Sequence, residues 1–213
     1  MRILTVHGWG FCPSVFKNLP PFVEHFWVDH SKGLRENVEL LKELVNSQTL
    51  LVGWSLGATL SGLVATSKPI KGLILIGATP HFGKAWKSSY IERFLKELNV
   101  DYGRKLEEFR KTAYGETDCP LPPKEGAIRL LKEFIETDIS NLLKELQIPT
   151  LLLHGKKDTI TPYREFKKML KLNSRFKGLA YDGGHFPLHL SQRDWETVFK
   201  SFPNLPPLGH PAK

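Results

Sequence analysis

Short runs of Leu, Ile and Val alternate with amphipathic segments along this chain, and the alternation predicts its secondary structure. The apolar runs are nearly continuous, as expected for strands buried on both faces of a sheet. They predict strands at residues 2–6, 26–28, 49–53, 72–76, 149–153 and 176–181. Helical spacing of apolar residues predicts helices at 35–45, 56–65, 163–172 and 194–202. This order predicts an α/β fold, with a mostly parallel sheet of about six strands flanked by helices.

The stretch from residue 84 to residue 137 has a different pattern. It contains no strand-like run, and its apolar residues follow helical spacing at 90–98, 106–114 and 127–135. We therefore interpret residues 84–137 as a helical cap inserted into a core formed by residues 1–83 and 138–202. Residues 203–213 are rich in proline and are expected to form a poorly ordered tail.

Composition narrows the class of protein. Of the 213 residues, 41% are hydrophobic and 24% are charged, which is typical of a soluble globular protein. No apolar run approaches the roughly 20 residues of a membrane span, and the apolar stretch at the start is too short for a signal peptide. The two cysteines, Cys12 and Cys119, are too few for a disulfide scaffold or a four-cysteine zinc site. We interpret them as reduced thiols of a cytoplasmic protein.

A candidate nucleophile follows the third predicted strand. The segment Gly53-Trp54-Ser55-Leu56-Gly57 matches the pattern G-x-S-x-G, in which serine occupies a tight turn between a strand and a helix. Glycines are needed two residues either side, because larger side chains would collide there. The structural alternative is that Ser55 only caps the helix that follows it.

An acid and a base complete the candidate site. Asp158 and His185 each come directly after a predicted strand, and the chain order Ser55, Asp158, His185 is that of a hydrolase triad. In such a triad His185 takes the serine proton, and Asp158 holds the imidazole tautomer. Because the carboxyl ends of parallel strands form one edge of the sheet, we expect these three side chains to meet there. Read singly, Asp158 could equally be a turn residue and His185 a loop residue.

The segment His7-Gly8-Trp9-Gly10 follows the first predicted strand. A turn there can direct the backbone N–H of Trp9 at a developing oxyanion, with the N–H of Leu56 as the second donor. For His7 we favour a buried, hydrogen-bonded structural role. His81 and Phe82 follow the fourth strand and are predicted, with Trp9, to contact the substrate.

Other aspartates and histidines are weaker candidates for the acid and the base. Asp182 lies on the same short loop as His185, which strains a pairing between them, and Asp138 and Asp29 are further possible acids. His189 is interpreted as a packing or capping residue, and three further histidines as surface or turn residues: His25, His30 and His210. We predict no metal, because no cluster has metal-ligand spacing, and no cofactor, because no G-x-G-x-x-G or P-loop motif is present.

These motifs resemble those of the α/β-hydrolase superfamily. VHGWG at residues 6–10, GWSLG at 53–57, ATPHF at 78–82, HGKKDTITP at 154–162 and GGH at 183–185 carry the resemblance. Within the superfamily they are most similar to the pimeloyl-acyl-carrier-protein methyl ester esterases of biotin synthesis. That resemblance implies Ser55 as nucleophile, His185 as base, Asp158 as acid, and the Trp9 and Leu56 N–H groups as oxyanion hole.

The expected function is hydrolysis of an acyl ester through an acyl-enzyme, with pimeloyl-acyl-carrier-protein methyl ester as the substrate that the resemblance implies. One alternative is a general short-chain carboxylesterase or thioesterase, and another is a non-catalytic binding module on a hydrolase fold. A net charge of +8 favours an acidic partner, and residues 164–177 hold six basic residues against one acid. A solvated helix face explains that run equally well. Nucleic acid is not expected as a partner, because the basic residues form no recognisable module.

Overall fold

The computed structural model describes residues 1–203. Its six strands form one parallel sheet in the order β2-β1-β3-β4-β5-β6. The strands are β1 (Arg2–Val6), β2 (Glu24–Phe26), β3 (Thr49–Trp54), β4 (Gly72–Ile76), β5 (Thr150–Gly155) and β6 (Phe176–Tyr181). The predicted α/β class and six-stranded parallel sheet are confirmed.

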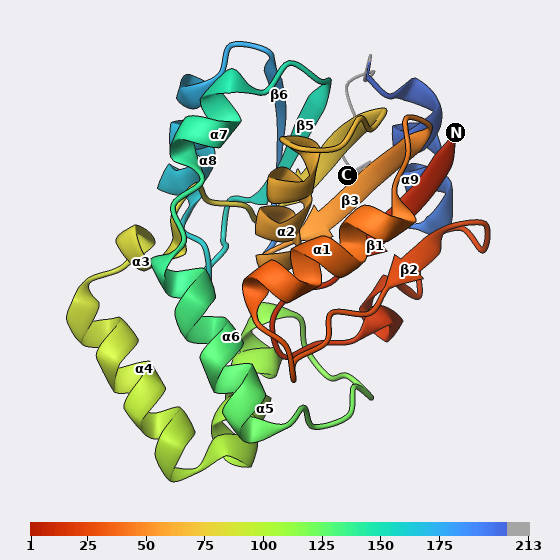
Figure 1. The fold of residues 1–213 in the computed structure, drawn as a ribbon. Helices are drawn as coiled ribbons and strands as arrows, with labels where there is room; N and C mark the ends of the chain where they lie inside the picture. Colours follow the sequence, from red (N-terminus) through yellow and green to blue (C-terminus); the bar gives the residue numbers. More distant parts are fainter. Residues whose placement is uncertain (204–213) are drawn as a thin grey trace.

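Helices cover both faces of the sheet. One face packs against α1 (Leu34–Leu44), α2 (Leu56–Ala65), α7 (Ser140–Glu145) and α8 (Tyr163–Leu172). In Figure 1, α1 and α2 lie in front of the strands. The opposite face packs against the short helix η1 (Pro13–Phe16) and α9 (Gln192–Ser201). Alternate residues of the central strands β1, β3, β4 and β5 therefore enter one of two separate apolar cores, which explains why these four strand sequences are mostly apolar.

The segment predicted to be a cap is helical. It contains α4 (Ser88–Val100), α5 (Tyr102–Ala113) and α6 (Lys124–Glu136), and α3 (Phe82–Ala85) leads into it. These helices lie together beyond one end of the sheet (Figure 1). The division into core and cap domains stays a prediction, and we use the word cap for residues 84–137. The predicted tail lies outside the described residues, apart from Pro203.

The second strand ends two residues earlier than predicted. β2 pairs with β1 up to Phe26, but Trp27 is exposed and the backbone N–H of Val28 donates to His7 Nε2 at 3.0 Å. That donor is therefore unavailable to the sheet. The short elements η1, α3 and α7 were not predicted either, because four to six residues are too few to produce a clear periodicity.

The interpretation of the cysteines as free thiols is wrong. Cys12 and Cys119 form a disulfide, with their Cα atoms 5.4 Å apart and a separation of 107 positions in the sequence. The disulfide joins the cap to the loop after β1. No local sequence pattern indicates that these two segments are in contact. Structural disulfides are uncommon in reducing compartments, so the cysteines no longer argue for the cytoplasm, and that location stays a prediction. Among residues 1–203, no helix combines the length and hydropathy that crossing a bilayer requires.

Candidate active site

Ser55 occupies a strained turn between β3 and α2. Its backbone has φ 57° and ψ −119°, a conformation that L-residues rarely adopt. A Cβ atom at Gly53 would lie 2.4 Å from the carbonyl oxygen of Gly57, and one at Gly57 would lie 2.0 Å from that of Val6. The two glycines are thus required for the turn to pass between β1 and α2. The Ser55 side chain makes no capping hydrogen bond, so the helix-cap alternative is wrong.

Asp158 and His185 are brought together, as predicted, from the loops after β5 and β6. His185 Nδ1 lies 2.7 Å from Asp158 Oδ2, and both side chains are buried. The other carboxylate oxygen, Oδ1, accepts the backbone N–H groups of Ile160 and Thr161, each at 2.8 Å. The rival acid Asp182 instead forms an exposed ion pair with Lys157. Asp158 is therefore the acid that holds this histidine.

The charge of Asp158 fixes the tautomer of His185. Burial raises the pKa of Asp158, but the His185 imidazole and the hydrogen bonds from His185 and Thr161 outweigh it, and the net pKa lies below its ordinary value. An ionised carboxylate can only accept, so Nδ1 carries the proton and Nε2 keeps its lone pair. Nε2 is buried and has no hydrogen-bond partner among the described residues.

The His185 imidazole lies beside the serine turn, and its Nε2 forms no hydrogen bond to Ser55. The imidazole packs on the ring of Trp54, the residue before Ser55, with centroids 5.5 Å apart, and Trp54 Nε1 donates to the His185 carbonyl at 3.1 Å. On its other side, a Cβ at Gly77 would lie 2.7 Å from His185 Cε1. Hydrogen bonds between nucleophile and base are often long in unliganded enzymes and tighten when substrate binds. The free lone pair is what a general base requires.

The loop after β1 passes directly against the serine. A Cβ at Gly8 would lie 3.2 Å from Ser55 Cβ. The N–H of Trp9 donates to no backbone carbonyl of residues 1–203. Leu56 is the first residue of α2, so its N–H has no partner inside the helix. Both predicted oxyanion donors are thus available, although their role stays a prediction.

Two histidines support this loop from beneath. His7 Nε2 accepts the Val28 N–H and its Nδ1 donates to the Gly8 carbonyl at 2.9 Å, so the predicted structural role is confirmed. Burial lowers its pKa to about 3, which keeps it neutral. His30 lies in a turn, which is one of the two positions expected for it, but it is buried rather than at the surface, and its Nε2 accepts the Gly10 N–H at 2.9 Å. Burial likewise lowers the pKa of His30, to about 4.

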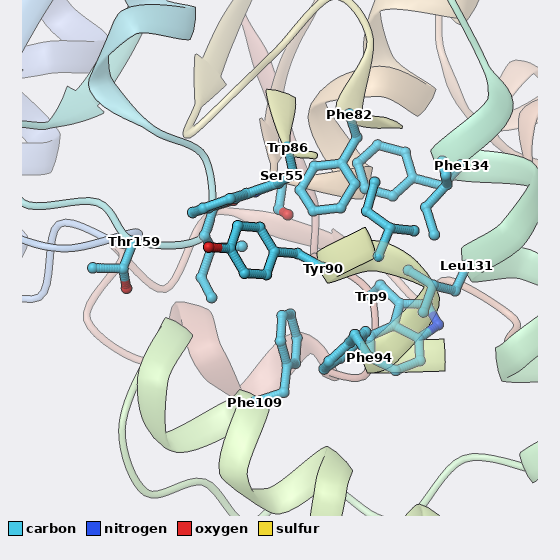
Figure 2. Close-up of a pocket in the computed structure, with 13 residues that line it drawn as sticks. Trp9, Ser55, Phe82, Trp86, Tyr90, Phe94, Phe109, Leu131, Phe134 and Thr159 are labelled. Carbon is cyan, nitrogen blue, oxygen red and sulfur yellow. The ribbon is translucent and has the colours of Figure 1, made fainter. Parts of the chain in front are cut away.

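Ser55 opens into an apolar cavity of about 350 Å³ between the core and the cap. Figure 2 shows aromatic side chains around it, and none of its 13 lining residues is charged. The lining consists of Trp9, Ser55, Phe82, Trp86, Tyr90, Ile91, Phe94, Phe109, Leu131, Phe134, Ile135, Thr159 and Ile160. Trp9 and Phe82 were predicted here. Sequence reasoning missed the cap residues, whose only signal is the apolar spacing of α4, α5 and α6.

The third predicted contact residue, His81, is not part of this lining. Its Nδ1 lies 3.2 Å from Asp138 Oδ2, between the start of α3 and the segment before α7. One group of described residues has ligand atoms close enough to hold a metal ion, namely Cys12, Asp118 and Cys119. A cysteine binds a metal through its thiolate, and here the two sulfurs are bonded to each other.

Comparison with solved structures identifies the fold of the chain. No protein-family model matches the chain. The bromoperoxidase of Bacillus anthracis superposes with a TM-score of 0.76 at 20% identity, covering 86% of this chain and 84% of that one. MGS-M2, an alpha/beta hydrolase enzyme from a Medee basin deep-sea metagenome library, superposes with a TM-score of 0.66 at 17% identity, covering 99% and 92%. The chain has the α/β-hydrolase fold.

Sequence comparison finds more specific relatives. The pimeloyl-[acyl-carrier protein] methyl ester esterase of Legionella pneumophila (strain Corby) is 25% identical over 218 residues, covering 91% of this chain and 91% of that protein. The enzyme of the same name from Wigglesworthia glossinidia brevipalpis is 24% identical over 218 residues, covering 82% and 81%. The resemblance expected from the motifs is therefore confirmed. In an α/β-hydrolase fold, the nucleophile turn and the acid and histidine loops have the chain order seen here.

Proposed function

We propose that this protein is a serine carboxylesterase that hydrolyses an acyl ester through an acyl-enzyme. The observation that carries the proposal is the buried Asp158–His185 pair, whose free Nε2 lies beside the strained Ser55 turn. A serine hydroxyl is a weak nucleophile at neutral pH and needs such a base. A binding module needs neither the strain nor the free lone pair, so the catalytic function is favoured.

The reaction proceeds in two halves. Ser55 Oγ attacks the ester carbonyl carbon while its proton passes to His185 Nε2, and the negative oxygen is stabilised by the N–H groups of Trp9 and Leu56. The tetrahedral intermediate then breaks its bond to the alcohol oxygen, which takes the proton from His185 and leaves. Water repeats the sequence on the acyl-enzyme, releases the carboxylic acid and restores Ser55. Asp158 stays ionised throughout and stabilises the imidazolium.

The cavity supports a neutral acyl substrate. Its volume of about 350 Å³ lies at the small end of ligand pockets, which span about 300–1,000 Å³. Its lining is uncharged, and burying an unpaired carboxylate is costly, so the cavity favours an ester over the acid that hydrolysis yields. With the curated relatives, this supports pimeloyl-acyl-carrier-protein methyl ester as the substrate. A general short-chain esterase or thioesterase would use the same residues.

Covalent labelling tests the serine mechanism. The protein is incubated with a fluorophosphonate, and the adduct is mapped by mass spectrometry. We expect modification at Ser55, none in Ser55→Ala, and slow modification in His185→Gln. His189→Gln is the matched control, because this exposed histidine lies four residues along the same segment and should label like the unaltered protein. Folded protein that is not modified at Ser55 would refute the mechanism.

A second experiment tests the substrate. The gene is expressed in a bacterial strain that lacks its pimeloyl-acyl-carrier-protein methyl ester esterase, and growth is followed without biotin. Growth that depends on Ser55 supports the proposed substrate. Failure to grow, with efficient hydrolysis of short p-nitrophenyl esters by the purified protein, would favour the general esterase instead.

A further inference from the structure

Arg110 is a buried arginine whose side-chain hydrogen bonds all go to backbone carbonyls. It lies on α5 in the cap, and its side chain donates from Nε to Gly10 at 2.6 Å, from Nη1 to Cys119 at 2.9 Å and from Nη2 to Pro120 at 2.8 Å. No carboxylate of residues 1–203 forms an ion pair with it. Buried charges are usually paired with an opposite charge. A guanidinium that donates all its hydrogen bonds to backbone carbonyls therefore indicates that Arg110 fixes the backbone segments that it contacts.

The contact with Gly10 falls next to the proposed oxyanion donor. Gly10 has φ +77°, and its N–H donates to His30 while its carbonyl accepts from Arg110. Both polar groups of the residue after Trp9 are therefore held by buried side chains. A Cβ at Gly10 would lie 2.6 Å from Leu106 Cδ1, so the loop also turns tightly beneath α5.

We propose that Arg110 is a positioning residue for the oxyanion hole, which holds the Gly10 carbonyl so that the Trp9 N–H faces Ser55. The inference rests on the proposed esterase function. It assigns to the cap a part in catalysis beyond lining the cavity. The indole of Trp9 is tied to the cap as well, through its Nε1 donation to the Ala127 carbonyl at 2.7 Å, but that bond restrains the side chain rather than the peptide that follows it.

The disulfide makes the proposal testable by substitution. Because Cys12 and Cys119 join the loop to the cap covalently, the cap stays attached when the Arg110 hydrogen bonds are removed. Arg110→Met keeps an unbranched chain about as far as the position of Nε and removes all the donors, whereas Arg110→Lys keeps the charge and can reach one carbonyl. The matched control is Arg104→Met, because Arg104 lies on the same helix and is exposed, with Asp101 and Glu108 as partners.

Steady-state kinetics on p-nitrophenyl acetate give the first measurement, with the absence of free thiols confirmed for each variant. Small misplacements in an active site cost up to about 100-fold in rate. We expect kcat to fall by about 10-fold to 100-fold in Arg110→Met with KM changed less than about twofold, an intermediate kcat in Arg110→Lys, and no change in Arg104→Met. A folded Arg110→Met protein with unchanged kcat, or with its loss confined to KM, would overturn the proposal.

Hydrogen–deuterium exchange gives a second measurement that does not need activity. Amides of residues 8–11 should exchange faster in both Arg110 variants than in the unaltered protein, with no change in Arg104→Met. If Arg110→Met does not fold, Arg110→Lys carries both measurements. Absence of labelling at Ser55 in the unaltered protein would refute the proposed function, whereas unchanged exchange at residues 8–11 would refute the positioning role of Arg110.

Discussion

Replacing Asp158 by Asn tests how the protein fixes the tautomer of His185. The carboxylate uses its two oxygens differently: Oδ2 faces His185 Nδ1 at 2.7 Å, and Oδ1 accepts two backbone N–H groups at 2.8 Å. An asparagine has one oxygen and one NH₂ group to place in these two positions. Its orientation decides which imidazole nitrogen carries the proton.

The backbone N–H groups of Ile160 and Thr161 determine how the asparagine amide is oriented. An NH₂ group turned toward Ile160 and Thr161 would leave two buried N–H groups without acceptors, at a cost of about 1–3 kcal/mol each. The amide oxygen therefore stays with the backbone, and the NH₂ group donates to His185 Nδ1. The imidazole proton moves to Nε2, which then cannot accept a proton from Ser55. The same substitution in a Ser-His-Asp protease lowers kcat by about 10⁴-fold, or about 5.4 kcal/mol of barrier.

We expect a loss of that size in Asp158→Asn, measured as kcat on p-nitrophenyl acetate. Asp182→Asn is the matched control, since Asp182 is an exposed acid nearer to His185 in sequence and pairs with Lys157. It should keep full activity. A folded Asp158→Asn protein that lost less than about tenfold in kcat would show that Asp158 does not set the tautomer.

Three further predictions concern stability, each followed by urea unfolding. Gly57→Ala should lower the free energy of unfolding by about 3 kcal/mol, because the new Cβ would collide with the backbone of Val6. Gly103→Ala should raise it by about 0.5–1 kcal/mol, because a Cβ there meets open space. Equal effects of the two substitutions would contradict this reasoning. Reducing the Cys12–Cys119 disulfide, which spans 107 positions, should cost about 2–4 kcal/mol, and unchanged stability under reductant would exclude a stabilising role. The folded pKa of His7, about 3, lies below its ordinary 6.5, so its contribution is complete above pH 6.5 and is lost as the pH falls toward 3. The slope there is at most about 1.4 kcal/mol per pH unit, and it should be shallower in His7→Gln.

The central part of the sheet was predictable because local patterns encode it. Strands β1, β3, β4 and β5 are buried on both faces, so apolar residues dominate their sequences, whereas the edge strands β2 and β6 include exposed polar residues. Ser55, Asp158 and His185 each come shortly after a strand, and parallel pairing brings the ends of these strands to one edge. The order of the elements, with the position of each polar residue after its strand, was therefore enough to predict the contact between Asp158 and His185, whereas catalysis by the three residues together stays a prediction.

The remaining features depend on contacts between distant segments. The Cys12–Cys119 disulfide and the hydrogen bond from Arg110 to Gly10 both cross from the cap to the loop after β1, and neither has a local signature. His81 follows its strand as Ser55, Asp158 and His185 follow theirs, yet it does not line the cavity, and its Nδ1 lies 3.2 Å from Asp138 Oδ2. Position after a strand places a residue at the correct edge of the sheet but does not set the direction of its side chain.

The hydrogen-bond partners of the buried histidines indicate which of them can serve as a base. His7 uses both ring nitrogens on backbone groups, with Nε2 accepting and Nδ1 donating, so it has no lone pair to offer. His154, which lies 3.5 Å from Asp158, uses its Nε2 to donate to the Thr161 carbonyl at 2.8 Å. His185 is held through Nδ1 alone, and its Nε2 lone pair remains free. Burial by itself does not single out His185, because His7, His30 and His154 are buried as well. The hydrogen-bond partners differ. At His7, backbone groups at both nitrogens fix a neutral ring in place, whereas at His185 a carboxylate at one nitrogen leaves the other able to take a proton and would stabilise the charge that results.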